Sequence, residues 1–280
     1  MISVLLALAC ILGVFSAQGF VSAEEKTATG IPDILLYERY PDATEFQIST
    51  PQGLQEFSRL GQTDTFAGKT LYMICDIDMN GFSYVPPVEF SGTFDGRFHA
   101  VKRLTVTTSD LNCGFIGKVT ATGVVRNLGM EAGIFTATCS KDGWRAGSVA
   151  GIVEKGLVEC CWSSSSVTIS GDYASLSVGG IVGGLQLGAI AKNCYFAGVA
   201  TGQKVAAGIS GWCQGSSDNF VGQIYNCFNM GQLVAETKYA IGRYSGSITE
   251  GNKSKAMFNS YYFDSTYTEY DWSEGDIKAS

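Results

Sequence analysis

The chain repeats itself with a period of 33 residues, and this period limits the possible folds more than any other feature of the sequence. Four neighbouring columns of the repeat each keep their chemical character from one unit to the next. The columns are Val125, Val158, Ala191, Ile224 and Met257; Asn127, Cys160, Asn193, Asn226 and Asn259; Leu128, Cys161, Cys194, Cys227 and Ser260; and Gly129, Trp162, Tyr195, Phe228 and Tyr261. Such a period indicates a solenoid of stacked units.

A second, looser motif places small residues around an aliphatic centre. Its copies are residues 113–117, 147–151, 179–183 and 207–211. Their final glycines are 34, 32 and 28 residues apart, so the loops between the two motifs vary in length. Fixed strands separated by variable loops are typical of stacked coils, and the small residues allow the chain to bend tightly from one face to the next.

Composition favours strands over helices. The chain has 45% hydrophobic residues, 35 glycines and 5 prolines, and segments such as 178–184 could not sustain a helix. Ankyrin and tetratricopeptide repeats, which have a similar period, are therefore excluded. We expect an all-β fold, a right-handed parallel β-helix or solenoid with a short N-terminal capping helix.

Stacking in register predicts ladders of equivalent side chains. Asn127, Asn193, Asn226 and Asn259 are expected to hydrogen-bond between rungs and so to satisfy polar groups buried at turns. The Cys, Val and Ile columns are expected to fill the interior. The aromatic column is expected to stack ring on ring, with Tyr261 buried in it.

The N-terminus has the pattern of an export signal. Residues 1–23 carry no charge, residues 4–17 are apolar, and Val21-Ser22-Ala23 fits a small-x-small cleavage site. The apolar run is short for a membrane span, and no second span follows. We therefore expect a protein that is secreted or held at the cell surface, with no transmembrane segment after cleavage.

The rest of the chain is divided by its repeat content. We expect an extended leader over 24–45, an N-terminal cap and first coil over 46–110, the repeat solenoid over 111–263, and a C-terminal cap or tail over 264–280. In the cap, Thr50 and Pro51 predict the start of a helix. Leu54, Phe57 and Leu60 then share one face and Gly61 ends the run, so the helix could cover the first rung.

The charge balance excludes some partners. The formal net charge is −7, and no cluster of Lys and Arg occurs. Nucleic acids and anionic membrane surfaces require such clusters to neutralise their phosphates. Neither class of partner is expected.

At the level of motifs, the chain resembles GLUG-motif proteins. The resemblance rests on residues 54–57, 75–79 and 90–96 and on the Gly-Gly-Ile-Val-Gly and Asn-Cys-Tyr units, and it covers roughly residues 46–263. In that family the motif marks repeat regions of large secreted or surface-attached proteins. The resemblance implies a β-solenoid scaffold at the cell surface rather than an enzyme mechanism.

Acidic residues near the first coil are candidates for chemistry. Asp76 and Asp78 alternate along a strand and face the same way, so with Asp95 they could form a calcium site or a carboxylate pair for glycoside hydrolysis. The structural alternative is a solvated strand end, with Asp95 bonded to its own turn. His99, the single histidine, has no nucleophile placed beside it by the sequence.

The cysteines and aromatic residues also have two interpretations each. Cys161, Cys194 and Cys227 could form disulfides or bind metal, but in-register side chains point in parallel, which favours buried reduced thiols. The aromatic side chains outside the ladder could stack on sugar rings or simply pack a cap. The candidates for ligand binding are Trp144, Trp212, Tyr262 and Trp272.

These observations predict a non-enzymatic extracellular scaffold for adhesion, matrix or glycan binding, with a glycan or a surface protein as partner and no cofactor other than possible calcium. The alternatives are a polysaccharide lyase or glycoside hydrolase on a β-helix, and a structural spacer or fragment of a larger surface protein. The lyase alternative lacks paired-Asp motifs on adjacent rungs, Gly-His-Gly and Arg-x-Lys.

Overall fold

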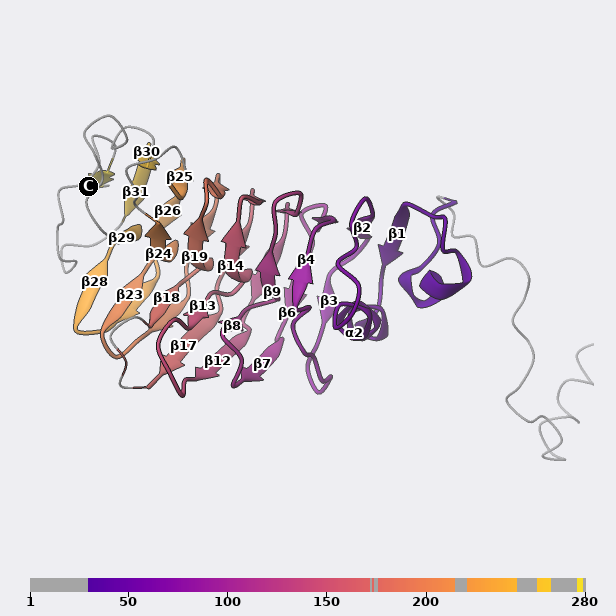
Figure 1. Cartoon of the computed structure of the whole chain (residues 1–280), viewed down its shortest axis with the longest axis horizontal. Coiled ribbons are helices and arrows are strands. Elements are labelled where there is room, and N and C mark those ends of the chain that lie inside the picture. Colours follow the sequence, from indigo (N-terminus) through magenta and orange to yellow (C-terminus); the bar gives the residue numbers. More distant parts are fainter. Residues whose placement is uncertain are drawn as a thin grey trace, which may run out of the picture.

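The computed structural model describes residues 30–171, 173, 176–214, 221–245, 256–262 and 276–278. These residues form an elongated parallel β-solenoid, which confirms the predicted fold (Figure 1). The predicted signal peptide over residues 1–23 lies outside the described residues. So do most of the predicted tail over 264–280 and the candidate Trp272.

Five sheets run along the solenoid, and we number them in the order in which the chain visits them within a coil. Sheet 1 contains β1 (Glu45–Ile48), β2 (Thr70–Met73), β5 (Thr93–Asp95), β10 (Val124–Arg126), β15 (Leu157–Glu159), β20 (Ile190–Lys192), β25 (Gln223–Tyr225) and β30 (Met257–Phe258). Sheet 2 contains β3 (Ile77–Asp78), β6 (Ala100–Lys102), β11 (Gly129–Glu131), β16 (Trp162–Ser163), β21 (Tyr195–Phe196), β26 (Phe228–Asn229), β31 (Ser260–Tyr262) and β32 (Asp276–Lys278).

The other three sheets complete each coil. Sheet 3 contains β7 (Thr105–Thr108), β12 (Ile134–Thr138), β17 (Ser166–Ser170), β22 (Val199–Thr201) and β27 (Gln232–Val234). Sheet 4 contains β8 (Asn112–Cys113), β13 (Arg145–Ala146), β18 (Ser177–Gly179), β23 (Val205–Ala207) and β28 (Thr237–Tyr239). Sheet 5 contains β4 (Glu89–Phe90), β9 (Ile116–Val119), β14 (Ala150–Glu154), β19 (Val182–Gln186), β24 (Ser210–Gln214) and β29 (Gly242–Ser245).

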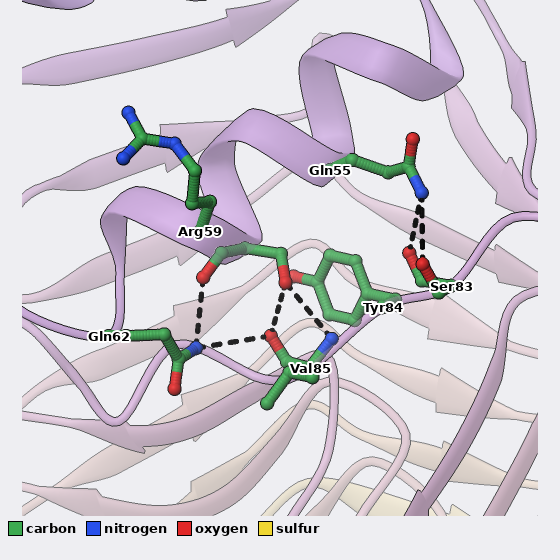
Figure 2. Close-up of a pocket in the computed structure, with 7 residues that line it drawn as sticks. Gln55, Arg59, Gln62, Ser83, Tyr84 and Val85 are labelled. Carbon is green, nitrogen blue, oxygen red and sulfur yellow. Dashed lines mark hydrogen bonds between the residues drawn. The ribbon is translucent and has the colours of Figure 1, made fainter.

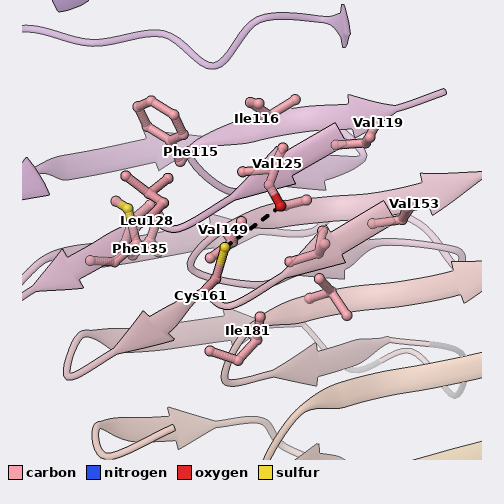
Figure 3. Packing of buried hydrophobic residues seen from close by; sticks show 14 of the residues in the cluster. Phe115, Ile116, Val119, Val125, Leu128, Phe135, Val149, Val153, Cys161 and Ile181 are labelled. Atoms are coloured by element: carbon pink, nitrogen blue, oxygen red, sulfur yellow. Dashed lines mark hydrogen bonds between the residues drawn. The ribbon is translucent and has the colours of Figure 1, made fainter. Parts of the chain in front are cut away.

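The 33-residue period is the register of the stack. In sheet 1 the parallel pairing places Val125 beside Val158, Val158 beside Ala191 and Ala191 beside Ile224. All four side chains are buried, so this column fills the interior as predicted. Figure 3 shows Val125 among the aliphatic and aromatic side chains that pack there.

The asparagine column lies at the corner between sheets 1 and 2. Its residues have φ angles between 48° and 55°, in the left-handed region that Asn tolerates better than most residues. The predicted contact between rungs is present, since Asn226 Nδ2 donates to Asn193 Oδ1 at 3.2 Å. The predicted burial is wrong for Asn193, Asn226 and Asn259, which are exposed. Asparagine suits these positions because it tolerates the left-handed backbone of the corner, and not because it hydrogen-bonds within a buried turn.

The glycine motif turns the chain from sheet 4 into sheet 5. At Gly180, a Cβ atom would overlap both the ring of Phe196 and the carbonyl oxygen of Gly208. The absence of a side chain at this position lets Phe196 fill the interior from the opposite wall.

A helical cap closes the N-terminal end, as predicted for part of this region. Helix α2 (Pro51–Leu60) begins after Thr50, whose Oγ1 accepts a hydrogen bond from Gly53 N at 3.1 Å. A 3₁₀ helix, η1 (Ile34–Arg39), packs beside it and buries Ile34 and Tyr37. The segment 24–45, expected to be an extended leader, therefore contains a helix in its described part, 30–45, because apolar side chains of η1 cover the first rung.

Candidate functional site

A row of four aromatic side chains lies on the outer face of sheet 2. Parallel pairing places Trp162, Tyr195, Phe228 and Tyr261, which we call the aromatic row, side by side on four successive strands. The residue before each of the first three is a buried cysteine, and side chains alternate across a strand. The row therefore points outward, and the expectation that Tyr261 is buried is wrong: it is 37% exposed.

The first two rings of the row stack with an offset. The ring centroids of Trp162 and Tyr195 are 5.8 Å apart and their planes are within 5° of parallel, which confirms the predicted stacking for this pair. Aromatic planes in contact are only about 3.5–4 Å apart, so rings with these centroids must be shifted sideways relative to each other. Part of each ring face is left uncovered, and Tyr195 is 41% exposed.

Gly129 pairs with Trp162 from the preceding coil and makes room for the first ring of the row. A Cβ atom at Gly129 would lie 2.5 Å from Cε2 of Trp162, so the indole leans over the backbone of the preceding coil. Any larger residue would push the indole away. Glycine, in place of the aromatic residues found further along this column, thus leaves room for the indole of Trp162.

Lys192 and Glu159 form an ion pair on sheet 1, on one side of the row, whereas the surface on the other side carries no charge. Two positions further along the strands stand Ser164, Ala197 and Met230, all exposed, and Met230 is 56% exposed. Together with the row they make an outward surface of aromatic, methyl and thioether groups. Such a surface suits the apolar faces of a neutral ligand.

The other end of the same face is charged. Lys102 Nζ lies 2.8 Å from Asp76 Oδ2 and 3.4 Å from Glu131 Oε2. His99 Nδ1 lies 3.4 Å from Asp76 Oδ1, and Arg103 is paired with Asp78. The first three strands of sheet 2 therefore carry a network of ion pairs that is open to solvent.

The three predicted carboxylates do not form one site. Asp76 pairs with Lys102 and Asp78 with Arg103, and these hydrogen bonds lower the pKa of each carboxyl group. Among the described residues no group of three or more Cys, His, Asp or Glu side chains could hold a metal ion. The proposed calcium site and carboxylate pair are thus not assembled, since each carboxylate is matched with its own cation.

Asp95 takes the structural alternative. It accepts a hydrogen bond from Arg97 N at 2.9 Å within its own turn, and others from Asn127 Nδ2 at 3.0 Å and Arg126 Nε at 2.9 Å. Burial alone would raise the pKa of Asp95, but these hydrogen bonds and the charge of Arg126 together lower it. Asp95 therefore links the first coil to the second.

His99 has no catalytic partner of the kind that a triad needs. No hydroxyl or thiol of the described residues is hydrogen-bonded to it, and its nearest charged neighbour is Asp76. A base without a nucleophile does not define an acyl-transfer site.

The aromatic residues predicted to bind a ligand are not brought together. Trp144 is 2% exposed and Tyr262 is buried, so neither can stack on a ligand. Trp212 is half-buried on sheet 5, where the guanidinium of Arg145 lies 4.7 Å from its ring centre. The candidates that sequence reasoning missed are Trp162, Tyr195 and Phe228, which it had placed in the ladder. The alternation of buried and exposed residues after the cysteine column is the signal that could have found them.

The thiol column lies directly behind the aromatic row. Cys161, Cys194 and Cys227 are buried, and none of the eight described cysteines is in a disulfide bond. The Sγ atom of Cys161 lies 3.7 Å from the carbonyl oxygen of Val125, as Figure 3 shows. Burial raises the pKa of the Cys161 and Cys227 thiols well above the usual range. These thiols act as small packing groups.

A hollow of 290 Å³ lies between α2 and the segment 83–85 (Figure 2). Its polar groups bond to one another. Gln55 Nε2 donates to Ser83 O and Oγ at 3.1 Å, and Ser58 Oγ donates to Val85 O at 2.7 Å. These hydrogen bonds hold the cap helix on the first coil. The hollow therefore has a structural role, and we do not place the functional site there.

Comparison with known proteins agrees with the solenoid class that the sheets define. The chain resembles the crystal structure of a putative immunoglobulin A1 protease from Bacteroides ovatus, with a TM-score of 0.51 and 18% sequence identity over 84% of this chain and 82% of that one. At this identity the likeness shows a shared fold. No protein-family model matches the chain, and no curated protein matches it.

None of the helices in the described part of the chain is long and apolar enough to cross a membrane.

Proposed function

We propose that this protein is a non-enzymatic extracellular solenoid that binds glycans along the aromatic row. The parallel stack of the half-buried Trp162 and the exposed Tyr195, continued in register by Phe228 and Tyr261, is the observation that carries the proposal. The export signal expected over residues 1–23 and the resemblance to GLUG-motif surface proteins support an extracellular setting.

The chemistry of the row favours a glycan over a charged partner. Sugar rings present flat arrays of C–H groups, which pack on aromatic faces, and the offset stack leaves part of each face free. The neighbouring Ser164, Ala197 and Met230 add no charge. A repeating ligand that lies along the solenoid axis meets one ring per coil, so weak contacts add up along the row.

Depletion of a panel of neutral and acidic polysaccharides by the purified protein tests the proposal. We expect retention of a neutral glycan by the native protein and loss of retention in the Trp162→Ala/Tyr195→Ala variant. Phe98→Ala is the matched control, because Phe98 is 77% exposed but stands outside the row. Retention that is equal in all three proteins would place the binding elsewhere, and no retention of any glycan would favour the spacer alternative.

The same assay separates binding from catalysis. Reducing ends or unsaturated products that vanish in an Asp76→Asn/Asp78→Asn variant would show an enzyme and overturn the proposal. The name of the structural neighbour adds proteolysis as a rival, and incubation with immunoglobulin A1 followed by electrophoresis tests it. We expect the immunoglobulin to stay intact.

A further inference from the structure

A second regular row lies on the outer face of sheet 3. Parallel pairing places Thr107 beside Thr136, Thr136 beside Thr168 and Thr168 beside Thr201. We call these four residues the threonine row. It occupies four successive coils and belongs to a different sheet from the aromatic row.

The threonine row faces solvent with its hydroxyl groups unused by the protein. The residues before Thr136, Thr168 and Thr201 are buried, so strand alternation turns the threonines outward. Thr107 is exposed and the other three are half-buried. Within the described part of the chain, none of the four hydroxyl groups makes a hydrogen bond to protein. Each is free to bond to water.

The face is also free of charge. Strands β7, β12, β17 and β22 contain no Asp, Glu, Lys or Arg, and the outward column next to the threonine row includes Ile134 and Ser166. Sheets 1, 2 and 5, by contrast, carry outward ion pairs such as Arg126–Asp95, Lys102–Asp76 and Lys118–Glu89. Over these four strands the face of sheet 3 therefore offers only hydroxyl and alkyl groups, and an amide, that of Gln232, first enters on the next strand, β27.

These groups form a lattice in two directions. Rungs of a parallel sheet are about 4.8 Å apart, and side chains two residues apart along a strand are separated by about 6.6 Å. Threonine is branched at Cβ and has few rotamers, so equivalent environments give equivalent positions of its methyl and hydroxyl groups. The tightly packed interior keeps this lattice rigid.

We propose that the threonine row and its neighbours form an ice-binding face. A rigid, neutral array of hydroxyl and methyl groups can hold a layer of ordered water that continues into an ice lattice. Charged side chains would bind water strongly in their own orientations, and this face excludes them. A glycan site of the kind proposed for the aromatic row would offer exposed aromatic rings, which the four strands lack, since their one aromatic residue, Phe135, is buried. The proposal does not depend on glycan binding by the aromatic row.

Ice growth in the presence of the purified mature protein tests the proposal. We expect faceted ice crystals, a measurable thermal hysteresis and slower recrystallisation of ice. Absence of all three effects at high protein concentration would overturn the proposal.

Variants locate the effect on the molecule. Thr136→Lys/Thr168→Lys places two charges in the middle of the lattice and should abolish the hysteresis, whereas Thr136→Ser/Thr168→Ser keeps the hydroxyl groups and should lose only part of it. The control Val88→Lys adds charge beside the face of sheet 5, at a residue that is 57% exposed and belongs to neither row, and should retain full activity. Far-UV circular dichroism confirms that each variant is folded. Equal loss in the Lys variants of both faces would contradict a site on sheet 3.

Discussion

The two ends of sheet 2 share a backbone and differ in what they present to solvent. At the N-terminal end, Asp76, Lys102 and Glu131 form a chain of ion pairs, whereas at the C-terminal end Trp162 and Tyr195 begin the aromatic row. The strands pair in the same parallel register throughout. The outer face can thus change its chemistry from coil to coil, because the paired backbones and the packed interior hold the coils in register.

The interiors behind these two ends differ as well. Near the cap, the ring of Phe57 lies between 5.2 and 5.9 Å from the rings of Phe66, Phe90, Phe94 and Phe115. Further along, large rings such as Phe196 lie among smaller groups such as Ala191 and Cys194, and no cluster of the described rings matches that around Phe57. We therefore expect the N-terminal end to carry more of the stability and the C-terminal end more of the binding.

The largest expected effect concerns the cap. Phe57→Ala should lower the free energy of unfolding by about 3–5 kcal/mol, because it removes a fully buried ring from the phenylalanine cluster. Ile224→Val, at a buried position near the other end, should cost only about 0.5–1.5 kcal/mol. Urea denaturation followed by circular dichroism measures both. Equal losses would break the contrast between the two interiors.

The buried thiols should make stability fall at high pH. Burial raises the pKa of Cys213 to about 12, whereas an unfolded thiol titrates near about 8.5. Above about pH 8.5 the unfolded chain releases a proton that the folded chain keeps, so unfolding becomes easier by up to about 1.4 kcal/mol per pH unit for this thiol. Below about pH 8.5 the thiol is protonated in both the folded and the unfolded chain, so its full contribution to stability is present.

Unfolding curves at several pH values between 7 and 10 test this expectation. Cys213→Ala should flatten the decline, whereas Val153→Ala, which also removes buried volume but does not titrate, should lower stability and keep the slope. An unchanged slope in Cys213→Ala would show that its thiol is not shielded from water.

The aromatic row should show a moderate coupling between neighbours. In a double-mutant cycle, Trp162→Ala and Tyr195→Ala should interact by about 0.5–1.5 kcal/mol, since the two rings stack. The cycle Trp162→Ala with Phe98→Ala is the control, and we expect no coupling in it. Additive effects in the first cycle would mean that the rings do not stack in solution.

The charged end should give the smallest effect. Asp76→Asn should cost no more than about 1 kcal/mol, because the carboxylate is nearly half exposed and its ion pair is screened by solvent. The hydrogen bond from Lys102 lowers the pKa of Asp76, so its contribution is present above the unfolded pKa of about 3.9 and is lost as the pH falls below it. Acid unfolding of the variant and the native protein measures the difference, which should vanish at the lowest pH.

The fold could be predicted well from the sequence, because residues one period apart occupy equivalent positions in the packed stack. The column Val125, Val158, Ala191 and Ile224 predicted the register, and Thr50 with Pro51 predicted the start of α2. The helix η1 was missed because a short 3₁₀ turn depends on contacts with the cap rather than on its own pattern.

The candidate site was harder to predict than the fold. Columns of equal chemical character do not say which side of the wall they face, so the sequence alone predicts a buried Tyr261. The buried state of Cys194 settles this, since the next residue along a strand must face the opposite way. Isolated residues such as Trp144 carried no such constraint, and burial placed Trp144 out of reach of any ligand.

The aromatic row gains one ring with each coil, and this has an evolutionary consequence. Duplication of a single 33-residue unit would lengthen the row by one ring and leave every existing contact unchanged, because each coil touches only its neighbours. Valency could thus be tuned by copy number, without any redesign of the core. A lineage that meets longer or shorter ligands would be expected to vary in coil count before it varies in the identity of its aromatic residues.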